Sequence, residues 1–202
     1  MKKLFMMFAL SGIVLASCSK DDDDNNNNNN APREVSMEEA ASGTYSMSGL
    51  RANLNIEFEA PFLGKVDIPL NVQGSQFNGD VSFTSDKVIF DVAMVIDYEF
   101  TILGQPNSDT DDGSVTARMS YEILPNNRLR CFVQDGTDDE PFVFFNGLEI
   151  DDITFIVTER LNTGVKMRAN VDTEIDFGGI IPGAPAGDGL PTVGQVFIDL
   201  KR

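Results

Sequence analysis

Hydrophobic and polar residues alternate along much of the chain with a period of two. The longest alternating stretches are 52–58, 88–100, 115–123 and 165–177. In the second of these, Val92 and Ile96 share one face, whereas Asp91 and Asp97 share the other. Alternation over such lengths predicts antiparallel strands with one buried and one solvated face.

Shorter runs and turn signals extend this pattern. Further strands are predicted at 44–48, 66–72, 76–84, 129–134, 142–145, 153–159 and 196–200. Turns are predicted at Gly74-Ser75, Asp112-Gly113, Pro125-Asn126-Asn127, Asp135-Gly136, Asn146-Gly147 and Asn162-Thr163-Gly164. Asn78-Gly79 is better explained as a bulge than as a hairpin tip, because Phe77, Val81 and Phe83 keep the period of two across it. Since some runs can merge, we expect an all-β domain of about ten strands.

Strand length favours one architecture over another. An alternating stretch of about 13 residues would span roughly 40 Å. Long sequential strands joined by short turns predict an antiparallel up-and-down barrel or half-barrel, with a β-sandwich as the alternative. A short helix is predicted just before the first strand, because Ser36 can cap the amide of Glu39 in a capping box.

The helix and the strand after it resemble the entry to a lipocalin barrel. The resemblance rests on the helix followed by Gly43-Thr44-Tyr45 and on the overall strand pattern. The lipocalin family has Gly-x-Trp at this place, whereas this chain contains no tryptophan. The resemblance implies an up-and-down, lipocalin-like barrel with an internal ligand site.

The first 17 residues have the layout of a secretory signal. Lys2 and Lys3 precede an apolar run that ends at Leu15 and is followed by the small residues Ala16 and Ser17. The apolar run is about a dozen residues long, and a bilayer span needs roughly 20. We therefore predict a removable signal peptide at 1–17.

Leu15-Ala16-Ser17-Cys18 resembles the lipobox of bacterial lipoproteins, which implies that Cys18 is acylated and holds the chain on membrane lipid. The residues that follow resemble the acidic export signal of surface lipoproteins of the Bacteroidetes group; they are Ser19, Lys20, Asp21, Asp22, Asp23 and Asp24. This second resemblance implies an outer-membrane protein that faces the cell exterior, with a periplasm-facing protein as the alternative. The Asp- and Asn-rich composition predicts a disordered tether at 18–35, before a folded domain at 36–202.

Charge and residue usage exclude several function classes. The chain has 15 basic and 32 acidic residues, so loss of the signal with Lys2 and Lys3 leaves 13 basic residues and a net charge near −19. Such a charge argues against nucleic acid and against anionic lipid as partners. The chain has no histidine, and the carboxylates of the alternating stretches fall on polar faces, so we expect neither an enzyme nor a cofactor. With Cys18 acylated, Cys131 has no partner and is predicted to be a small buried hydrophobe.

Large, adaptable side chains on the predicted inward faces are the candidates for ligand binding. They are Phe90, Met94, Tyr98, Met119, Tyr121, Phe155 and Met167. In a hollow barrel they would form an apolar pocket with two phenolic hydroxyls, and in a filled barrel they are core. The loop 178–191 is a candidate lid through Ile180, Ile181 and Leu190, with an ordinary connection as the alternative.

Two acidic stretches, 107–113 and 135–140, have oxygen ligands that would suit calcium. The first departs from the EF-hand pattern and the second has no ligand spacing, so we interpret both as solvated hairpin tips and expect no metal. The sequence thus predicts a lipid-anchored surface protein that binds a small apolar or amphipathic ligand in a barrel calyx. The alternative is a structural or adhesive β-sandwich that contacts a protein or glycan. The oligomeric state stays open.

Overall fold

The computed structural model describes residues 31–60, 64–102, 104–144, 148–175 and 189–202. It contains the helix α1 (Met37–Ala40) and the strands β1 (Gly43–Ala60), β2 (Gly64–Phe83), β3 (Lys87–Ile102), β4 (Gln105–Leu124), β5 (Arg128–Phe132), β6 (Glu140–Phe144), β7 (Leu148–Ile150), β8 (Asp152–Leu161), β9 (Gly164–Ile175) and β10 (Leu190–Lys201). Within these ranges, no helix is long and apolar enough to cross a membrane.

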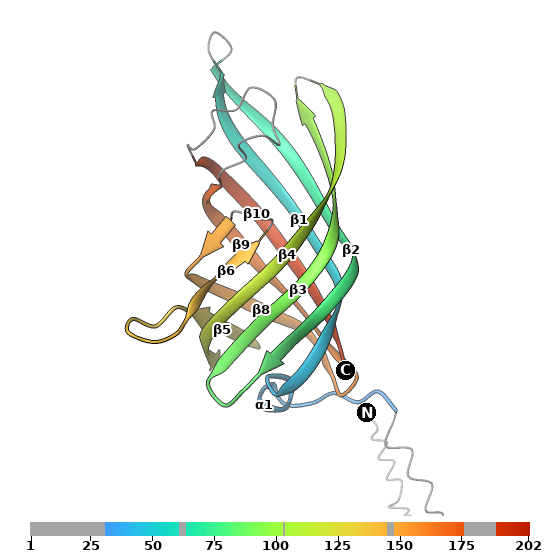
Figure 1. The fold of residues 1–202 in the computed structure, drawn as a ribbon, viewed down its shortest axis with the longest axis vertical. Coiled ribbons are helices and arrows are strands. Elements are labelled where there is room, and N and C mark those ends of the chain that lie inside the picture. The colour runs from blue at the N-terminus through green and yellow to red at the C-terminus, as the bar shows by residue number, and fades with distance from the viewer. Residues whose placement is uncertain (1–30, 61–63, 103, 145–147, 176–188) are drawn as a thin grey trace, which may run out of the picture. The chain divides into compact units, whose positions relative to one another are not determined.

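All ten strands belong to one antiparallel sheet (Figure 1). Eight of them close a ring in the order β1, β2, β3, β4, β5, β8, β9 and β10, and β10 pairs back to β1. The hairpin of β6 and β7 adds to β4 outside this ring. The predicted all-β barrel of about ten strands is confirmed, and the sheet is not divided into the two layers of a sandwich.

The ring is complete only in the half of the barrel that contains α1. There the short strand β5 joins β4 to β8 through five residue pairs on each side. Beyond this junction, Gln105–Ser114 of β4 pairs with β3 alone among the described strands. Asn170–Ile175 of β9 likewise pairs only with β10. The long strands therefore continue past the closed ring as a half-barrel.

Several predicted strands merge into longer ones. The runs 44–48 and 52–58 both belong to β1, and 66–72 and 76–84 both belong to β2. The turn predicted at Gly74-Ser75 is therefore wrong. Gly74 faces the interior, where an added Cβ would lie 3.0 Å from the sulfur of Met94 and 3.1 Å from Cβ of Leu50. The glycine allows close packing within a strand instead of a reversal of the chain.

The bulge predicted near Asn78-Gly79 is confirmed. The pairing of β2 with β3 shifts register between Ser75 and Asn78. Gly79 has a φ of 119°, and a Cβ at this position would lie 2.0 Å from the carbonyl oxygen of Asp91. Only glycine fits a backbone that approaches the next strand so closely.

The hairpin tip predicted at 107–113, with its turn at Asp112-Gly113, is wrong. The chain reverses near Gly104, and the acidic stretch lies within β4, with Asp109 opposite Tyr98 and Asp111 opposite Ile96. The inward apolar face of β3 continues to Phe100, so the strand keeps a partner along its full length. Aspartates are tolerated in β4 because this part of the strand is exposed.

Side chains cap the edge of β4 that has no partner among the described strands. The amide of Thr110 donates to Oδ1 of Asp109, and the amide of Asp112 donates to Oδ1 of Asp111, each at 2.8 Å. Alternate residues of an antiparallel strand direct their N–H groups to opposite sides, so both amides face away from β3. Pro106 has the same parity and carries no N–H. Charge, caps and proline together block the addition of another strand.

Removing both caps should therefore cause self-association. In the double variant Asp109→Ala/Asp111→Ala we expect dimers or larger species at concentrations where the parent chain shows none, because two N–H groups become available on an edge with less charge. Analytical ultracentrifugation of the mature chain without its acyl groups measures this. Asp80→Ala/Asp91→Ala, which removes the same charge from residues paired on both sides, is the control. Equal behaviour of the two variants would count against the capping role.

The closed end holds the start of the domain. Ser36 caps α1 as predicted, with its hydroxyl oxygen accepting from the Glu39 amide at 3.1 Å. Before the helix, Glu34 forms a β-bridge to Leu161, and the buried Val35 donates its amide to the carbonyl of Arg160 at 3.2 Å. The compact unit accordingly begins at Pro32, slightly before the predicted boundary at 36.

Candidate functional site

The seven predicted ligand-binding residues all face the barrel interior. Six of them are core residues that are at most 5 % exposed: Phe90, Met94, Tyr98, Met119, Phe155 and Met167. Tyr121 is half-buried and packs against the same core. The structure therefore brings the predicted residues together, but they pack against other protein side chains.

Two phenylalanines from β6 help to fill the interior. Phe142 and Phe144 are at most 1 % exposed, and their rings lie 5.7 Å apart. The Phe142 ring lies 5.2 Å from that of Phe90 and 6.1 Å from that of Phe155. The sequence prediction placed a strand here but did not identify these residues as interior groups. The alternation of Phe142 and Phe144 was the available signal.

The hollow beside Met167 is small. It measures about 10 Å³, and it lies between α1 and β9, with Leu129 and Val157 in its wall. A volume of this size is about enough for one water molecule. It offers no room for an apolar ligand.

The two tyrosine hydroxyls lie in different surroundings. The Tyr121 hydroxyl is 2.9 Å from the carbonyl oxygen of Thr84 and 3.2 Å from that of Ala41, so it holds the closed end together. Burial and the carboxylates of Asp111 and Asp109 raise the pKa of the Tyr98 hydroxyl above its ordinary value. Both hydroxyls therefore stay protonated near neutral pH.

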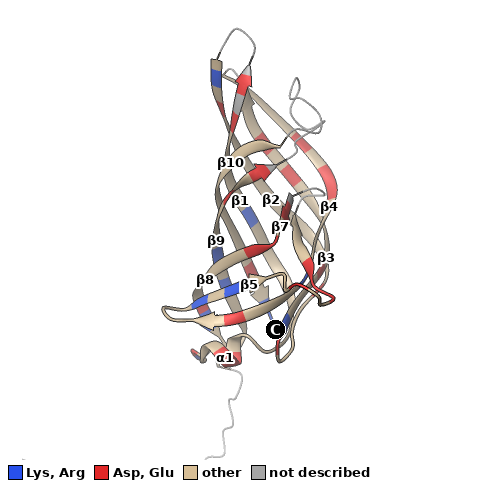
Figure 2. Cartoon of the chain, turned by 90° about the vertical axis from the view of Figure 1, so that its left-hand side faces the viewer, with Lys and Arg blue, Asp and Glu red and all other residues tan. Residues whose placement is uncertain are grey.

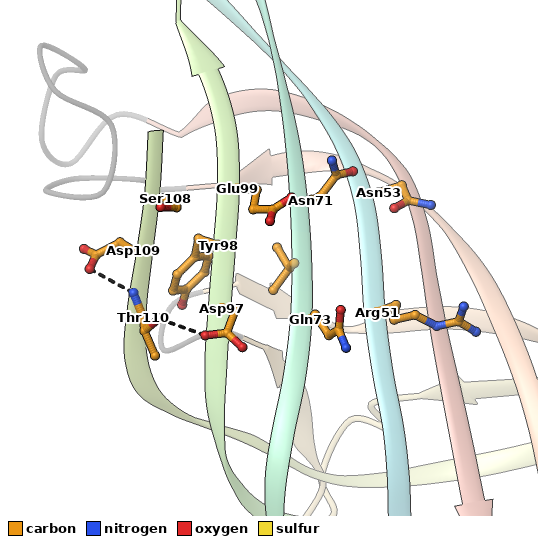
Figure 3. A pocket seen from close by; sticks show the side chains of 11 residues that line it. Arg51, Asn53, Asn71, Gln73, Asp97, Tyr98, Glu99, Ser108, Asp109 and Thr110 are labelled. Carbon is orange, nitrogen blue, oxygen red and sulfur yellow. Dashed lines mark hydrogen bonds between the residues drawn. The ribbon is translucent and has the colours of Figure 1, made fainter. Parts of the chain in front are cut away.

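Larger hollows lie on the outer wall of the long strands. Two rows of polar side chains cross β1, β2, β3 and β4, namely Arg51, Gln73, Asp97 and Thr110 in the first row and Asn53, Asn71, Glu99 and Ser108 in the second. Strand pairing sets the members of each row opposite one another (Figure 3). They line a hollow of about 470 Å³, which we call the outer groove. Val72, Tyr98 and Asp109 also border it, although they pair with one another on the inward face of the sheet, between the two rows.

Carboxylates dominate the charge of the outer groove. Asp97 and Glu99 of the polar rows are acidic, whereas Arg51 is the one basic residue of the lining. The Thr110 hydroxyl donates to Oδ1 of Asp97 at 2.8 Å. The outer groove is therefore a hydrogen-bonding surface with an excess of negative charge.

Contacts from neighbouring strands hold part of the outer groove in position. The Arg51 guanidinium lies over the Phe197 ring of β10, 5.5 Å from its centroid. Such a cation–π contact restricts the arginine before any ligand arrives. Beyond the groove on the same outer wall, the Gln195 amide donates to the Asn170 side-chain oxygen at 3.0 Å.

A second hollow continues the outer groove toward the tip of the half-barrel. It measures about 510 Å³ and shares Asn71, Glu99 and Ser108 with the outer groove. Pro69 and Pro106 lie in its wall. The two hollows therefore form one extended surface with three residues of the second polar row in common.

The second acidic loop is not simply a solvated hairpin tip. The Asp139 carboxylate, whose side chain is 0 % exposed, forms an ion pair with Lys87. It also accepts from the Ser120 hydroxyl at 2.9 Å and from the backbone amide of Gln134 at 3.0 Å. Burial favours the neutral acid, but these hydrogen bonds outweigh it and lower the pKa of Asp139 to about 2. The loop thus ties β5 and β6 to β3 and β4.

The predicted lid residues do not form a lid in the described part of the chain. Leu190, predicted in a lid, is instead a buried residue at the start of β10, paired with Ile175, and that assignment is wrong. Ile180, Ile181, Cys18 and the residues 19–24 lie outside the described residues.

Cys131 is buried as predicted, and burial raises the pKa of its thiol to about 12, so it is not a reactive nucleophile. In the described ranges, no three histidine, cysteine or acidic residues are placed to hold a metal ion.

The polar rows of the outer groove were missed at the level of the sequence. Alternation assigned Asn53, Asp97 and Glu99 to polar faces, but it does not fix which residues of neighbouring strands lie opposite each other. The comparisons with family models and curated proteins give no site that could be transferred to the chain. No protein-family model matches it, and no curated protein matches its sequence.

Proposed function

We propose that this chain is a lipid-anchored binding protein of the bacterial cell surface and that it holds its partner in the outer groove. The observation that supports the site is the pair of polar rows in register across four strands. The packed interior favours the outer wall over an internal calyx as the place of binding. With no histidine in the chain, we propose a binding role and no catalytic role.

The position of the tether suits this role. The chain enters the domain at the closed end, where Glu34 bridges to Leu161 and α1 precedes β1. Arg51 lies eight residues after the start of β1 at Gly43, which corresponds to about 25 Å along the strand. Acylation of Cys18 would therefore hold the closed end nearer the membrane and leave the outer groove accessible from the medium.

The charge distribution is compatible with this orientation. Figure 2 shows most Lys and Arg residues in the half of the domain near α1, whereas the far half of the long strands carries mainly Asp and Glu. An anionic membrane surface repels acidic groups. The acidic half should accordingly point away from the membrane when the closed end is tethered.

A photocrosslinker tests the proposed site on intact cells. With a benzophenone side chain at position 71, in the shared polar row, we expect a covalent adduct after irradiation, because the partner lies against Asn71. The same group at position 78, an exposed asparagine of β2 that lies outside the outer groove and about 20 Å further along the strand, is the control. Gel mobility and mass spectrometry measure the adduct.

Two outcomes would contradict the proposed site. One is equal crosslinking at positions 71 and 78, which indicates no preference for the outer groove. The other is no adduct at position 71 together with a lipid-sized adduct on the purified chain in native mass spectrometry. The second result would favour an apolar ligand in the barrel interior.

A further inference from the structure

We infer that the partner of the outer groove is a neutral or amine-bearing polysaccharide that lies across the strands. This inference rests on the proposed function, since it names the ligand class of the same site. Three features of the lining support it: the hydrogen-bonding groups, the excess of carboxylates and the length of the polar rows.

The hydrogen-bonding groups of the outer groove suit a hydroxyl-rich ligand. Asn53, Asn71 and Gln73 carry primary amides, each with two donor hydrogens and one acceptor oxygen. Ser108 and Thr110 add hydroxyls that donate and accept. Sugar hydroxyls also donate and accept, so adjacent hydroxyls of one ring can bond both sides of an amide.

The absence of apolar anchors argues against a protein partner. Protein interfaces usually have an apolar core that contains aromatic or other large side chains. Among the described residues, Val193 is the one large hydrophobic residue that is exposed, and it does not line the outer groove. The Phe197 ring is partly covered by the Arg51 guanidinium. A ligand that relies on hydrogen bonds fits this surface better than one that buries apolar area.

Charge narrows the class of sugar. Asp97 and Glu99 outnumber Arg51, so a sulfated or uronic acid chain would meet repulsion. A neutral chain meets none, and an amine on the sugar would be attracted to the carboxylates. The outer groove therefore selects against anionic polysaccharides.

The extent of the lining favours a polymer over a single sugar. Four neighbouring strands lie about 4.8 Å apart, so each polar row extends about 14 Å. The adjoining hollow of about 510 Å³ shares Asn71, Glu99 and Ser108 and lengthens the surface. Several consecutive sugar rings can then contact the rows at once.

A polysaccharide and glycan array tests the inference with the whole mature chain carrying Cys18→Ser, which removes the acyl groups. We expect binding to neutral or amino polysaccharides and none to sulfated or uronic acid chains. Asn71→Ala should weaken this binding about tenfold, because two hydrogen bonds are lost. Asn78→Ala, on the same strand as Asn71 but outside the lining, should bind like the parent chain. Unchanged thermal unfolding of both variants shows that they fold.

The outcomes separate this inference from the proposed function. Selective binding to anionic polysaccharides overturns the inference. Binding to neutral or amino polysaccharides that Asn71→Ala leaves unchanged also overturns it. An empty array combined with a protein crosslinked at position 71 and not at 78 also overturns it, while the outer groove survives as a binding site. An empty array with no preference for position 71 overturns both.

Discussion

Replacing Cys18 with alanine should release the protein from the membrane fraction and leave its signal peptide uncleaved. The resemblance to bacterial lipoproteins implies that the Cys18 thiol is acylated, and acyl chains supply the free energy of membrane anchoring. Alanine has no group to acylate, so we expect a complete loss of labelling by a radioactive or clickable fatty acid. Membrane fractionation and the mass of the purified chain measure attachment and processing.

A second variant separates anchoring from export. Replacement of Asp21, Asp22, Asp23 and Asp24 with alanine leaves Cys18 in place, so the chain should stay membrane-bound while its exposure to protease on intact cells decreases. Normal fractionation and labelling of Cys18→Ala would show that the chain is not held through this cysteine. Unchanged protease sensitivity of the aspartate variant would argue against the export signal.

Replacing Asp139 with alanine should lower the free energy of unfolding by about 3 kcal/mol, the range for loss of one partner of a buried ion pair. The change leaves the Lys87 ammonium without its carboxylate, and the Lys87 side chain is only 16 % exposed. It also leaves the backbone amide of Gln134 without its acceptor. Urea denaturation followed by circular dichroism measures the difference.

The neighbouring residue provides a matched control for this prediction. Asp138 pairs with Arg118 at 3.5 Å, and its side chain is 75 % exposed. An exposed pair of this kind contributes little, so Asp138→Ala should change the unfolding free energy by less than about 1 kcal/mol. Equal effects of the two substitutions would show that the Asp139 network does not stabilise the fold.

The same network makes stability depend on acid. The folded-state pKa of Asp139 is about 2, below its ordinary value of 3.8. A lowered folded-state pKa contributes stability that is fully present above pH 4 and is lost as the pH falls toward 2. The loss should amount to about 2 kcal/mol in the parent chain. Asp139→Ala should lack this component of the acid dependence.

Local periodicity was sufficient to predict the fold class. Alternation along 88–100 gave β3 almost as it stands, and the capping box at Ser36 gave α1. The Asn78-Gly79 bulge followed from the unbroken period of two around it. These features depend on neighbouring residues in the chain, which is why sequence reasoning reached them.

Turn signals failed where pairing with another strand determined the structure. Asp112-Gly113 has turn propensity, yet it lies in β4 because the long apolar face of β3 requires a partner. Gly74 has the same propensity, yet it serves close packing against Met94. Tertiary contacts override local preference in both cases.

The outer groove could not be predicted from the sequence for a similar reason. A shift of register by one residue would turn Gln73 to the opposite face and place Val72 in the row. The row of Arg51, Gln73, Asp97 and Thr110 exists only in the observed register. Sequence patterns identify the polar face of each strand, but they do not give the order of residues across the sheet.

The most direct measurement of the binding site is a map of backbone amide chemical shifts. The spectrum of the ¹⁵N-labelled mature chain with Cys18→Ser is recorded during addition of the array glycan that binds most strongly. We predict that the perturbed amides cluster on β1 to β4 around Asn53, Asn71 and Glu99, with little change at Phe155. Perturbation concentrated at inward residues such as Met119 and Phe155, with Asn71 unaffected, would contradict binding in the outer groove.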